Sequence, residues 1–331
     1  MTVDSAVVPP ALPRSTVGKF LRLVMIEHSV FALPFAYIAA LSAMRHPGIG
    51  PRFAKSLDGS GGVDFAIVGD GDGDGYAHVD WRALLLITVA MVGARTFAMA
   101  ANRIIDRRVD GLNPRTANRE LVTGALPVRA AVIGAGVALV VFLAAAALLN
   151  PLSLALAPLA LIPLTLYSYA KRVTWAPHAV LALAQAVAPI GAWIGVTGHW
   201  SWPAVVLGVA VGLWIGGFDV IYALQDREAD IRNGVKSVPA RFGVRASLHI
   251  STWTHVVTFA LFAWFGRLEH FGAYWWTGLS ITAVAFAYEH SIVKVNDQSR
   301  INRAFFTANG FIGIALFVFA VADLVDRGLR P

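Results

Sequence analysis

Long runs of apolar residues alternate with short polar connections along most of this chain. Nine runs approach the roughly 20 residues that cross the hydrocarbon core of a bilayer. They cover residues 24–44, 82–102, 129–149, 151–169, 178–197, 203–224, 247–267, 272–290 and 304–324. Because a segment in lipid must satisfy its own backbone hydrogen bonds, we expect each run to be a helix. The pattern predicts an all-α integral membrane protein, a bundle of about nine transmembrane helices around one central cavity.

Composition supports the membrane interpretation and excludes several chemistries. The chain is 57% hydrophobic and only 14% charged, whereas soluble domains have charged residues at about a quarter of positions. The absence of cysteine excludes disulfides, thiolate metal sites and cysteine nucleophiles. We divide the chain into a cytoplasmic segment 1–23, a polytopic domain 24–324 and a tail 325–331. Proline interrupts the opening residues Val7–Pro13, so we expect no cleavable signal there.

Lysines and arginines are concentrated in the N-terminal segment and in the even-numbered connections between the runs. Cytoplasmic loops of membrane proteins have such an excess, so we expect the N-terminus inside the cell. The net charge of +7 then reflects membrane orientation and contact with anionic lipid. Nucleic-acid binding is not expected.

The connection 45–81 is expected to be a long outer loop, and its glycine-rich middle resembles half of a calcium-binding loop. Asp70, Asp72, Asp74 and Gly75 match the first positions of such a loop. The closing glutamate is missing, because Trp81 occupies its position. We therefore favour a solvated loop over a calcium site.

Two acidic motifs, 102–110 and 222–230, follow the ends of two long apolar runs. Within each motif the aspartates are four residues apart, so on a helix they share one face, with a polar residue one turn earlier. The members are Asn102, Asp106 and Asp110 in the first motif and Tyr222, Asp226 and Asp230 in the second. A charged side chain costs roughly 2.5–3.5 kcal/mol near the bilayer centre, so two matching pairs indicate a function.

A metal-bound diphosphate explains the paired motifs. Magnesium prefers oxygen ligands and usually takes one or two carboxylates together with substrate phosphates. Two pairs on facing helices could hold such ions around a diphosphate, and basic residues on the same side would neutralise its charge. Candidate cations on that side are Arg107, Arg108, Arg115, Arg119, Lys171, Arg172, Arg227, Lys236 and Arg241. Each of them could instead be an ordinary member of the positive-inside pattern.

Three patterns together resemble the UbiA-type membrane prenyltransferases. They are Asn102-x3-Asp106-x3-Asp110, Asp219-x2-Tyr222-x2-Gln225-Asp226-x3-Asp230, and Lys236-Ser-Val-Pro-Ala-Arg241-Phe-Gly243. Other stretches resemble the 4-hydroxybenzoate polyprenyltransferase branch. They are Glu27–Phe35, Tyr169-Ala-Lys171-Arg172 and Ala188–Trp193. The first motif departs from the family pattern at Arg103, where many relatives have aspartate.

The resemblance implies Mg2+-dependent transfer of a long isoprenyl chain from a polyprenyl diphosphate to an aromatic acid in quinone biosynthesis. The four motif aspartates would hold the metal and diphosphate, facing the cytoplasm, in a bacterial inner membrane. Ionisation would leave an allylic cation that the aromatic ring attacks, and the ring would then lose a proton. An apolar bundle suits this chemistry because it keeps water away from a carbocation.

Three further residues are candidates within the spans. Arg95 lies two turns before Asn102 on the same face, and its guanidinium could hold the acceptor's carboxylate. The alternative is a fixed carboxylate partner such as Glu289 or Glu27. Asp219 extends the second acidic face as a ligand, a base or a structural hydrogen-bonding group. Tyr222 could stabilise the cation or donate to phosphate, or simply lie at the interface.

The acceptor and the protein class each have an alternative. A dihydroxynaphthoate, as in the futalosine route to menaquinone, would need similar recognition of a ring and a carboxylate. A membrane transporter could also place acidic residues among helices. Transport sites, however, lie near the bilayer midplane, and here the carboxylates gather at one side.

Overall fold

A computed structural model describes residues 15–24, 32–46 and 77–331, and these are mostly helical. The helices are α1 (Thr16–Leu23), α2 (Leu33–Met44), α3 (Trp81–Leu112), α4 (Val128–Leu149), α5 (Pro151–Val173), α6 (Pro177–Thr197), α7 (Trp202–Tyr222), the 3-10 helix η2 (Ala223–Asp226), α8 (Arg227–Asn233), α9 (Val238–Leu268), α10 (Ala273–Ile292), the π-helix η3 (Arg303–Ala308) and α11 (Asn309–Asp326). Two short strands, β1 (Ala77–His78) and β2 (Leu329–Arg330), complete the described elements. The possible calcium loop, the Val7–Pro13 segment, Glu27 and His28 lie outside the described residues.

The all-helical class is confirmed, because described helices cover eight of the predicted apolar runs and the described part of the first, where α2 begins at Leu33. By length and composition, six helical segments in the described part of the chain could cross a membrane. They are α3, α4, α5, α6, the continuous segment Trp202–Asn233, and Arg303–Asp326. Helix α2 is apolar but has only 12 residues, and α9 and α10 are not among the six. The count of nine spans stays a prediction.

The third and fourth apolar runs form a tight helical hairpin. Helix α4 ends at Leu149 and α5 begins at Pro151. Asn150 Oδ1 accepts the backbone N–H of Ser153 at 2.8 Å and caps α5, while its Nδ2 donates to the Ile194 carbonyl at 2.7 Å. Proline suits the first helical position because its missing N–H would have no partner there. Asn150 therefore caps α5 and joins the α4–α5 hairpin to α6.

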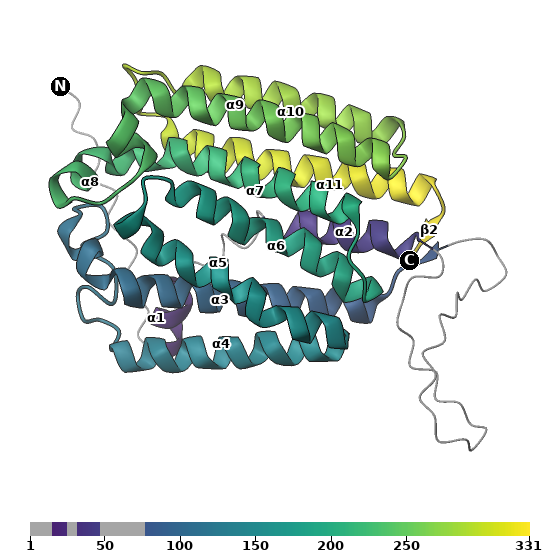
Figure 1. Ribbon diagram of the computed structural model, residues 1–331, viewed down its shortest axis with the longest axis horizontal. Helices are drawn as coiled ribbons and strands as arrows, with labels where there is room; N and C mark the ends of the chain where they lie inside the picture. Colours follow the sequence, from purple (N-terminus) through teal and green to yellow (C-terminus); the bar gives the residue numbers. More distant parts are fainter. Residues whose placement is uncertain (1–14, 25–31, 47–76) are drawn as a thin grey trace.

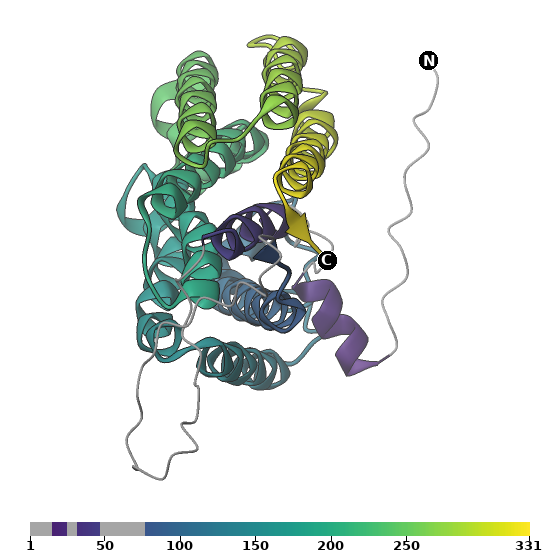
Figure 2. The same cartoon turned by 90° about the vertical axis from the view of Figure 1, so that its right-hand side faces the viewer.

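Most helices run along the long axis of the molecule, with α8 at one end and β2 at the other (Figure 1). Strands β1 and β2 pair in parallel, with Ala77 opposite Leu329, and join the start of α3 to the end of the chain. Viewed from the side in Figure 2, α2 lies inside the arrangement, where it contacts α3, α6, α7 and α11.

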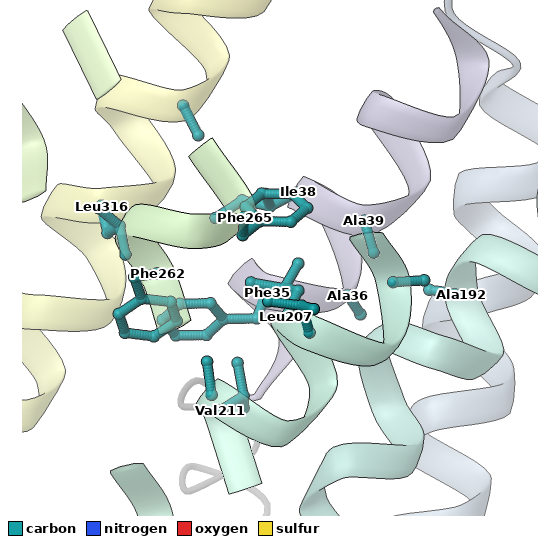
Figure 3. Packing of buried hydrophobic residues seen from close by; sticks show 14 of the residues in the cluster. Phe35, Ala36, Ile38, Ala39, Ala192, Leu207, Val211, Phe262, Phe265 and Leu316 are labelled. Atoms are coloured by element: carbon teal, nitrogen blue, oxygen red, sulfur yellow. The ribbon is translucent and has the colours of Figure 1, made fainter. Parts of the chain in front are cut away.

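The core forms around α2. Phe35 is fully buried; its ring stacks on Phe262 of α9 with centroids 5.5 Å apart and tilts against Trp214 of α7 at 5.1 Å. Figure 3 shows Phe35 beside Leu207, with Ile38 above it near Phe265. Because α2 is buried on most sides, it joins the α6–α7 pair to the α9–α11 group.

Helix α7 approaches α6 closely through three glycines spaced four residues apart, Gly208, Gly212 and Gly216. A Cβ at Gly212 would lie 2.2 Å from the Ala182 carbonyl oxygen, and one at Gly208 would lie 2.6 Å from that of Ala186. Small residues allow helix backbones to come this close in membrane proteins. The contact fixes the spacing between the two helices that form one wall of the site described below.

We expect Gly212→Ala to destabilise the protein by about 1–3 kcal/mol, because the methyl group must push the α6 backbone away. Gly136 of α4 provides a matched control, since a Cβ there would meet no described atom within 4 Å. Gly136→Ala should be neutral or stabilising by up to about 1 kcal/mol, because alanine favours a helix. Thermal unfolding of both variants in one detergent measures the difference. Identical unfolding midpoints would show that the glycine contact does not contribute to stability.

Candidate active site

A cavity of about 650 Å³ runs between α3, α4, α5, α6 and α7 and reaches α8 and η3. Its polar end lies where α3 ends and α8 begins. Polar residues there are Asn102, Asp110, Asn113, Arg115, Arg119, Lys171, Tyr222, Asp226, Asp230 and Lys236. Mainly apolar side chains line the remainder, as far as Ile87, which is about 35 Å from Asp110 along α3. The cavity thus joins a charged end to a long apolar interior.

The first motif lies on α3, as predicted, and its aspartates differ in surroundings. Asp106 is fully buried and does not line the cavity. Its Oδ2 accepts Asn102 Nδ2 at 2.8 Å and lies 2.6 Å from Lys171 Nζ, while its Oδ1 is 3.4 Å from Arg172 Nη2. Burial of a carboxylate is tolerated when cations and hydrogen bonds compensate it. Asp106 therefore ties α3 to the end of α5.

Asp110 lies one turn further along α3 and lines the cavity. Arg119 Nη1 donates to its Oδ1 at 2.6 Å, and the Thr116 hydroxyl donates to its backbone carbonyl at 2.8 Å. Both partners belong to the connection between α3 and α4. Arg103, which departs from the family pattern, is buried and donates its Nε to the Leu23 carbonyl of α1 at 3.4 Å.

The second motif does not lie on one continuous α-helix, contrary to the expectation. Helix α7 ends at Tyr222, the 3-10 turn η2 ends at Asp226, and Asp230 belongs to α8. A 3-10 turn is common at a helix end, because its tighter hydrogen bonds satisfy the last carbonyls. The 3-10 turn separates Tyr222 from Asp226, whereas Asp226 directly precedes α8, and both Asp226 and Asp230 line the cavity.

Asp226 is the centre of the strongest contacts at the polar end. Arg115 binds both of its oxygens, with Nε 2.7 Å from Oδ1 and Nη2 on Oδ2, and Asn113 Nδ2 donates to Oδ1 at 2.8 Å. Arg115 also lies over the Tyr222 ring, 5.3 Å from its centroid. Burial alone would lower the pKa of Arg115, but the hydrogen bonds and charge of Asp226 raise it above the usual value. The guanidinium therefore stays charged.

Asp230 has a neutral partner instead of a cation. The Ser237 hydroxyl donates to its Oδ2 at 2.8 Å and also caps the start of α9. Lys236 lines the cavity but donates its Nζ to the Val173 carbonyl at 3.0 Å.

The structure brings both motifs to one end of the cavity, with the connection after α3 between them: Asn113 and Arg115 contact the second motif, and Arg119 contacts the first. Lys171 and Lys236 lie there too, whereas Arg172 contacts Asp106 from behind the cavity wall. Arg241 is exposed and is not among the residues that line the cavity.

Arg95 lines the apolar part of the cavity. Its Nε is buried without a hydrogen-bond partner among the described residues. Glu289, one of the two fixed partners considered, is hydrogen-bonded instead to Asn309 Nδ2 at 3.0 Å. Glu27, the other partner considered, lies outside the described residues; among those described, nothing prevents Arg95 from binding an anion that enters the cavity.

His178 is a cavity residue that the sequence reasoning missed. Its Nδ1 is 2.7 Å from Asp219 Oδ2, while its buried Nε2 has no hydrogen-bond partner in the part of the chain that the structure describes. Asp219 therefore orients a histidine on the neighbouring helix. The only sequence signal is a lone polar residue at the start of an apolar run, which does not reveal a partner 41 residues away.

Residues of the polar end could hold a divalent metal only together with a ligand. Among the described residues, no three histidine or acidic side chains are close enough to form a metal site on their own. The available donors are carboxylate and amide oxygens, which suit Mg2+ and leave positions for phosphate oxygens and water. The donor set therefore fits a metal that arrives with a diphosphate.

Comparison with known sequences agrees with this chemistry. Residues 74–312 match the UbiA prenyltransferase family. The 4-hydroxybenzoate octaprenyltransferase of Saccharophagus degradans is 30% identical over 244 residues, which cover 74% of this chain and 81% of the relative. The enzyme of the same name from Nitrosococcus oceani is 32% identical over 244 residues, covering 73% and 85%.

Solved structures show the same fold. The apo structure of a UbiA homolog from Aeropyrum pernix K1 has a TM-score of 0.73 and 29% identity, covering 90% of this chain and 98% of the homolog. A UbiA homolog from Archaeoglobus fulgidus bound to GPP and Mg2+ has a TM-score of 0.62 and 21% identity, covering 93% and 99%. The chain therefore belongs to the UbiA prenyltransferase family and is an enzyme that transfers prenyl groups.

Proposed function

We propose that this enzyme uses Mg2+ to transfer a long isoprenyl chain from a prenyl diphosphate to an aromatic acid such as 4-hydroxybenzoate, in quinone biosynthesis. The main support is the cavity: its charged end suits the diphosphate group of a prenyl diphosphate, and its long apolar interior suits the prenyl chain. Relatives named 4-hydroxybenzoate octaprenyltransferase support the acceptor. Membership of the family removes the transporter alternative.

We further propose that nine helices span the inner membrane of a bacterium, with the acidic end of the bundle in the cytoplasm. Nine apolar runs and the concentration of lysine and arginine in the N-terminal segment and the even-numbered connections support this arrangement. Lipid access suits the donor, since its tail is hydrocarbon.

Asp110, Asp226 and Asp230 would hold Mg2+ together with the diphosphate, and Asp106 would join them when Lys171 moves to a phosphate. The metal would supply positive charge that stabilises the leaving diphosphate. The residues present support such an exchange, since Asp106, Asp110 and Asp226 are each held by a lysine or arginine that can also bind phosphate.

The chain's own cations and aromatic rings would assist ionisation of the donor. Arg115, Arg119 and Lys171 would bind the departing diphosphate as the bond from its oxygen to the first prenyl carbon breaks. Tyr222 and Phe305 line the cavity beside Asp226, with their ring centroids 4.2 Å apart, and would stabilise the allylic cation. The apolar walls would exclude water, which otherwise traps the cation.

Arg95 would bind the carboxylate of the acceptor and so hold its ring in the cavity. The acceptor ring would form a carbon–carbon bond with the prenyl cation and then lose the proton from that ring carbon. His178 would receive the proton at Nε2, because its Nδ1 is already engaged by Asp219. Asp219 would then orient the base and balance its positive charge.

A dihydroxynaphthoate remains the second candidate acceptor, because Arg95 would recognise its carboxylate in the same way. Membranes containing the protein, supplied with Mg2+ and a long-chain prenyl diphosphate, should prenylate one of the two acids. Mass spectrometry of the products identifies the acceptor. Formation of neither product by intact protein, or product formation that continues after chelation of divalent metals, would contradict the proposal.

Asp226→Ala should lower turnover by about 100-fold or more, because the metal and diphosphate lose a ligand and Arg115 loses its partner. Asp326→Ala, an exposed aspartate at the opposite end of the bundle, is the control and should leave turnover unchanged. Product formation measured at saturating substrates gives the comparison. Equal turnover in the two variants, with both proteins folded, would exclude Asp226 from the diphosphate site.

Arg95→Ala should raise the KM for the aromatic acid by roughly 10- to 100-fold, since a charge-assisted contact is worth about 1.5–3 kcal/mol. The KM for the prenyl diphosphate should change little. Arg82→Ala, at the exposed start of the same helix, is the control. A rise confined to the diphosphate KM would instead place Arg95 at the diphosphate.

His178→Gln should lower kcat while leaving both KM values close to those of the wild type, because proton removal follows binding of both substrates. The expected loss is about 100-fold, typical of a missing general base. Gln185→Ala, another polar residue lining the cavity on α6, controls for a general disturbance of that wall. An unchanged kcat in His178→Gln would assign the proton to another acceptor.

A further inference from the structure

A second, basic cleft lies between α9 and α10. Its volume is about 330 Å³, and none of its described lining residues lines the main cavity. Helix α9 follows α8 directly, so the cleft is at the same end of the bundle as the acidic motifs (Figure 1). The proposed prenyl transfer gives this cleft no role.

Two helices supply the cations of the cleft. Arg245 and His249 are one turn apart on α9, His290 lies in the last turn of α10, and Lys294 follows just after that helix ends at Ile292. The break in α9 at Gly243, with φ 79° and ψ 176°, starts new helical turns beside Arg245. The N–H groups that begin a helix also attract anions. The cleft therefore combines side chains and backbone that favour negative charge.

The cations at the rim are available to a ligand. Arg245, His249 and Lys294 are exposed, and no side-chain hydrogen bond joins any of them to another described residue. Asp297 is an acidic neighbour that interacts electrostatically with Lys294. Its hydrogen bonds, however, go to Ser299: Oδ1 accepts the Ser299 N–H at 3.0 Å and the Ser299 hydroxyl at 2.7 Å. Lys294 thus keeps a free ammonium group beside the cleft.

The floor of the cleft is fixed. His290 Nδ1 lies 3.2 Å from the Thr252 hydroxyl, and its Nε2 lies 2.9 Å from Nδ1 of the buried His255. Since both ring nitrogens are engaged within the protein, His290 holds the two helices together. A ligand would therefore bind at the rim formed by Arg245, His249 and Lys294.

Both helices that form the cleft also have an apolar outer surface. Large apolar side chains beyond it are exposed on both helices, among them Trp253 and Val256 on α9 and Val284 and Tyr288 on α10. In a membrane bundle such side chains face lipid. A molecule with an anionic head and long hydrocarbon chains would match the basic cleft and this surface together.

We propose that this cleft binds the headgroup of an anionic phospholipid, whose acyl chains lie along the exposed surface of α9 and α10. The lipid phosphate would contact Arg245 and Lys294, and His249 would donate a hydrogen bond to a remaining headgroup oxygen. The site is separate from the prenyl diphosphate site, so lipid binding does not depend on the proposed reaction.

Native mass spectrometry of the full-length protein, with phosphatidylglycerol, phosphatidylcholine or inorganic phosphate added, tests the proposal. The wild type should retain phosphatidylglycerol in preference to phosphatidylcholine. The double variant Arg245→Gln/Lys294→Gln should bind phosphatidylglycerol roughly 30-fold more weakly, from about 1 kcal/mol for each cation. The control Arg108→Gln/Arg129→Gln removes two exposed arginines near the same end and should retain the wild-type affinity.

Three results would overturn the assignment. One is equal retention of the two phospholipids by the wild type. Another is equal affinity for phosphatidylglycerol in the two double variants, which would mean that general surface charge attracts the lipid. The third is displacement of phosphatidylglycerol by inorganic phosphate at equal concentration, because a phosphate site would then not use the acyl chains.

Discussion

Neutralising carboxylates at the end of an apolar bundle is the constraint on which the site depends. An unpaired buried charge is costly, and attraction repays the loss of hydration only when the partner is close and well oriented. Lys171 of α5 meets that requirement for Asp106 of α3, and Arg115 meets it for Asp226 across more than a hundred residues of sequence. Asp106 thus joins α3 to α5, and Asp226 joins η2 to the connection that follows α3.

In the proposed reaction, the same pairs would prepare the enzyme for a charged substrate. A diphosphate and its metal would bring both signs of charge into the cavity, and each pair could open so that the carboxylate meets the metal and the cation meets the phosphate. Arg115 is well placed for this exchange, because it touches Asp226 and the Tyr222 ring at once. Under this proposal, stability without substrate and binding of substrate would depend on the same residues.

The sequence was sufficient for the helices, because long apolar runs permit few other structures in a membrane. It was also sufficient to place the two acidic motifs at the same end of the bundle, because both follow apolar runs whose ends lie on the side rich in lysine and arginine. It was insufficient for features that depend on contacts between helices. Nothing local marks the change from α7 to the 3-10 turn before Asp226. The pairing of His178 with Asp219 depends on how closely the glycines of α7 let α6 approach, which a linear pattern does not specify.

Hydrogen-bond satisfaction separates two kinds of polar residue inside the bundle. Asn309 accepts the Trp214 indole at 2.7 Å and donates to Glu289 at 3.0 Å, so it joins α7, α10 and α11. Buried polar groups normally have such partners. Arg95 and His178 each keep one buried nitrogen without a partner among the described residues, and both line the cavity. A ligand that fills the cavity would supply the missing partners of Arg95 and His178, whereas Glu289 Oε2 and Trp275 Nε1, which also lack a hydrogen-bond partner among the described residues, lie outside the cavity. Position in the cavity together with the missing partner therefore supports the substrate roles proposed for Arg95 and His178.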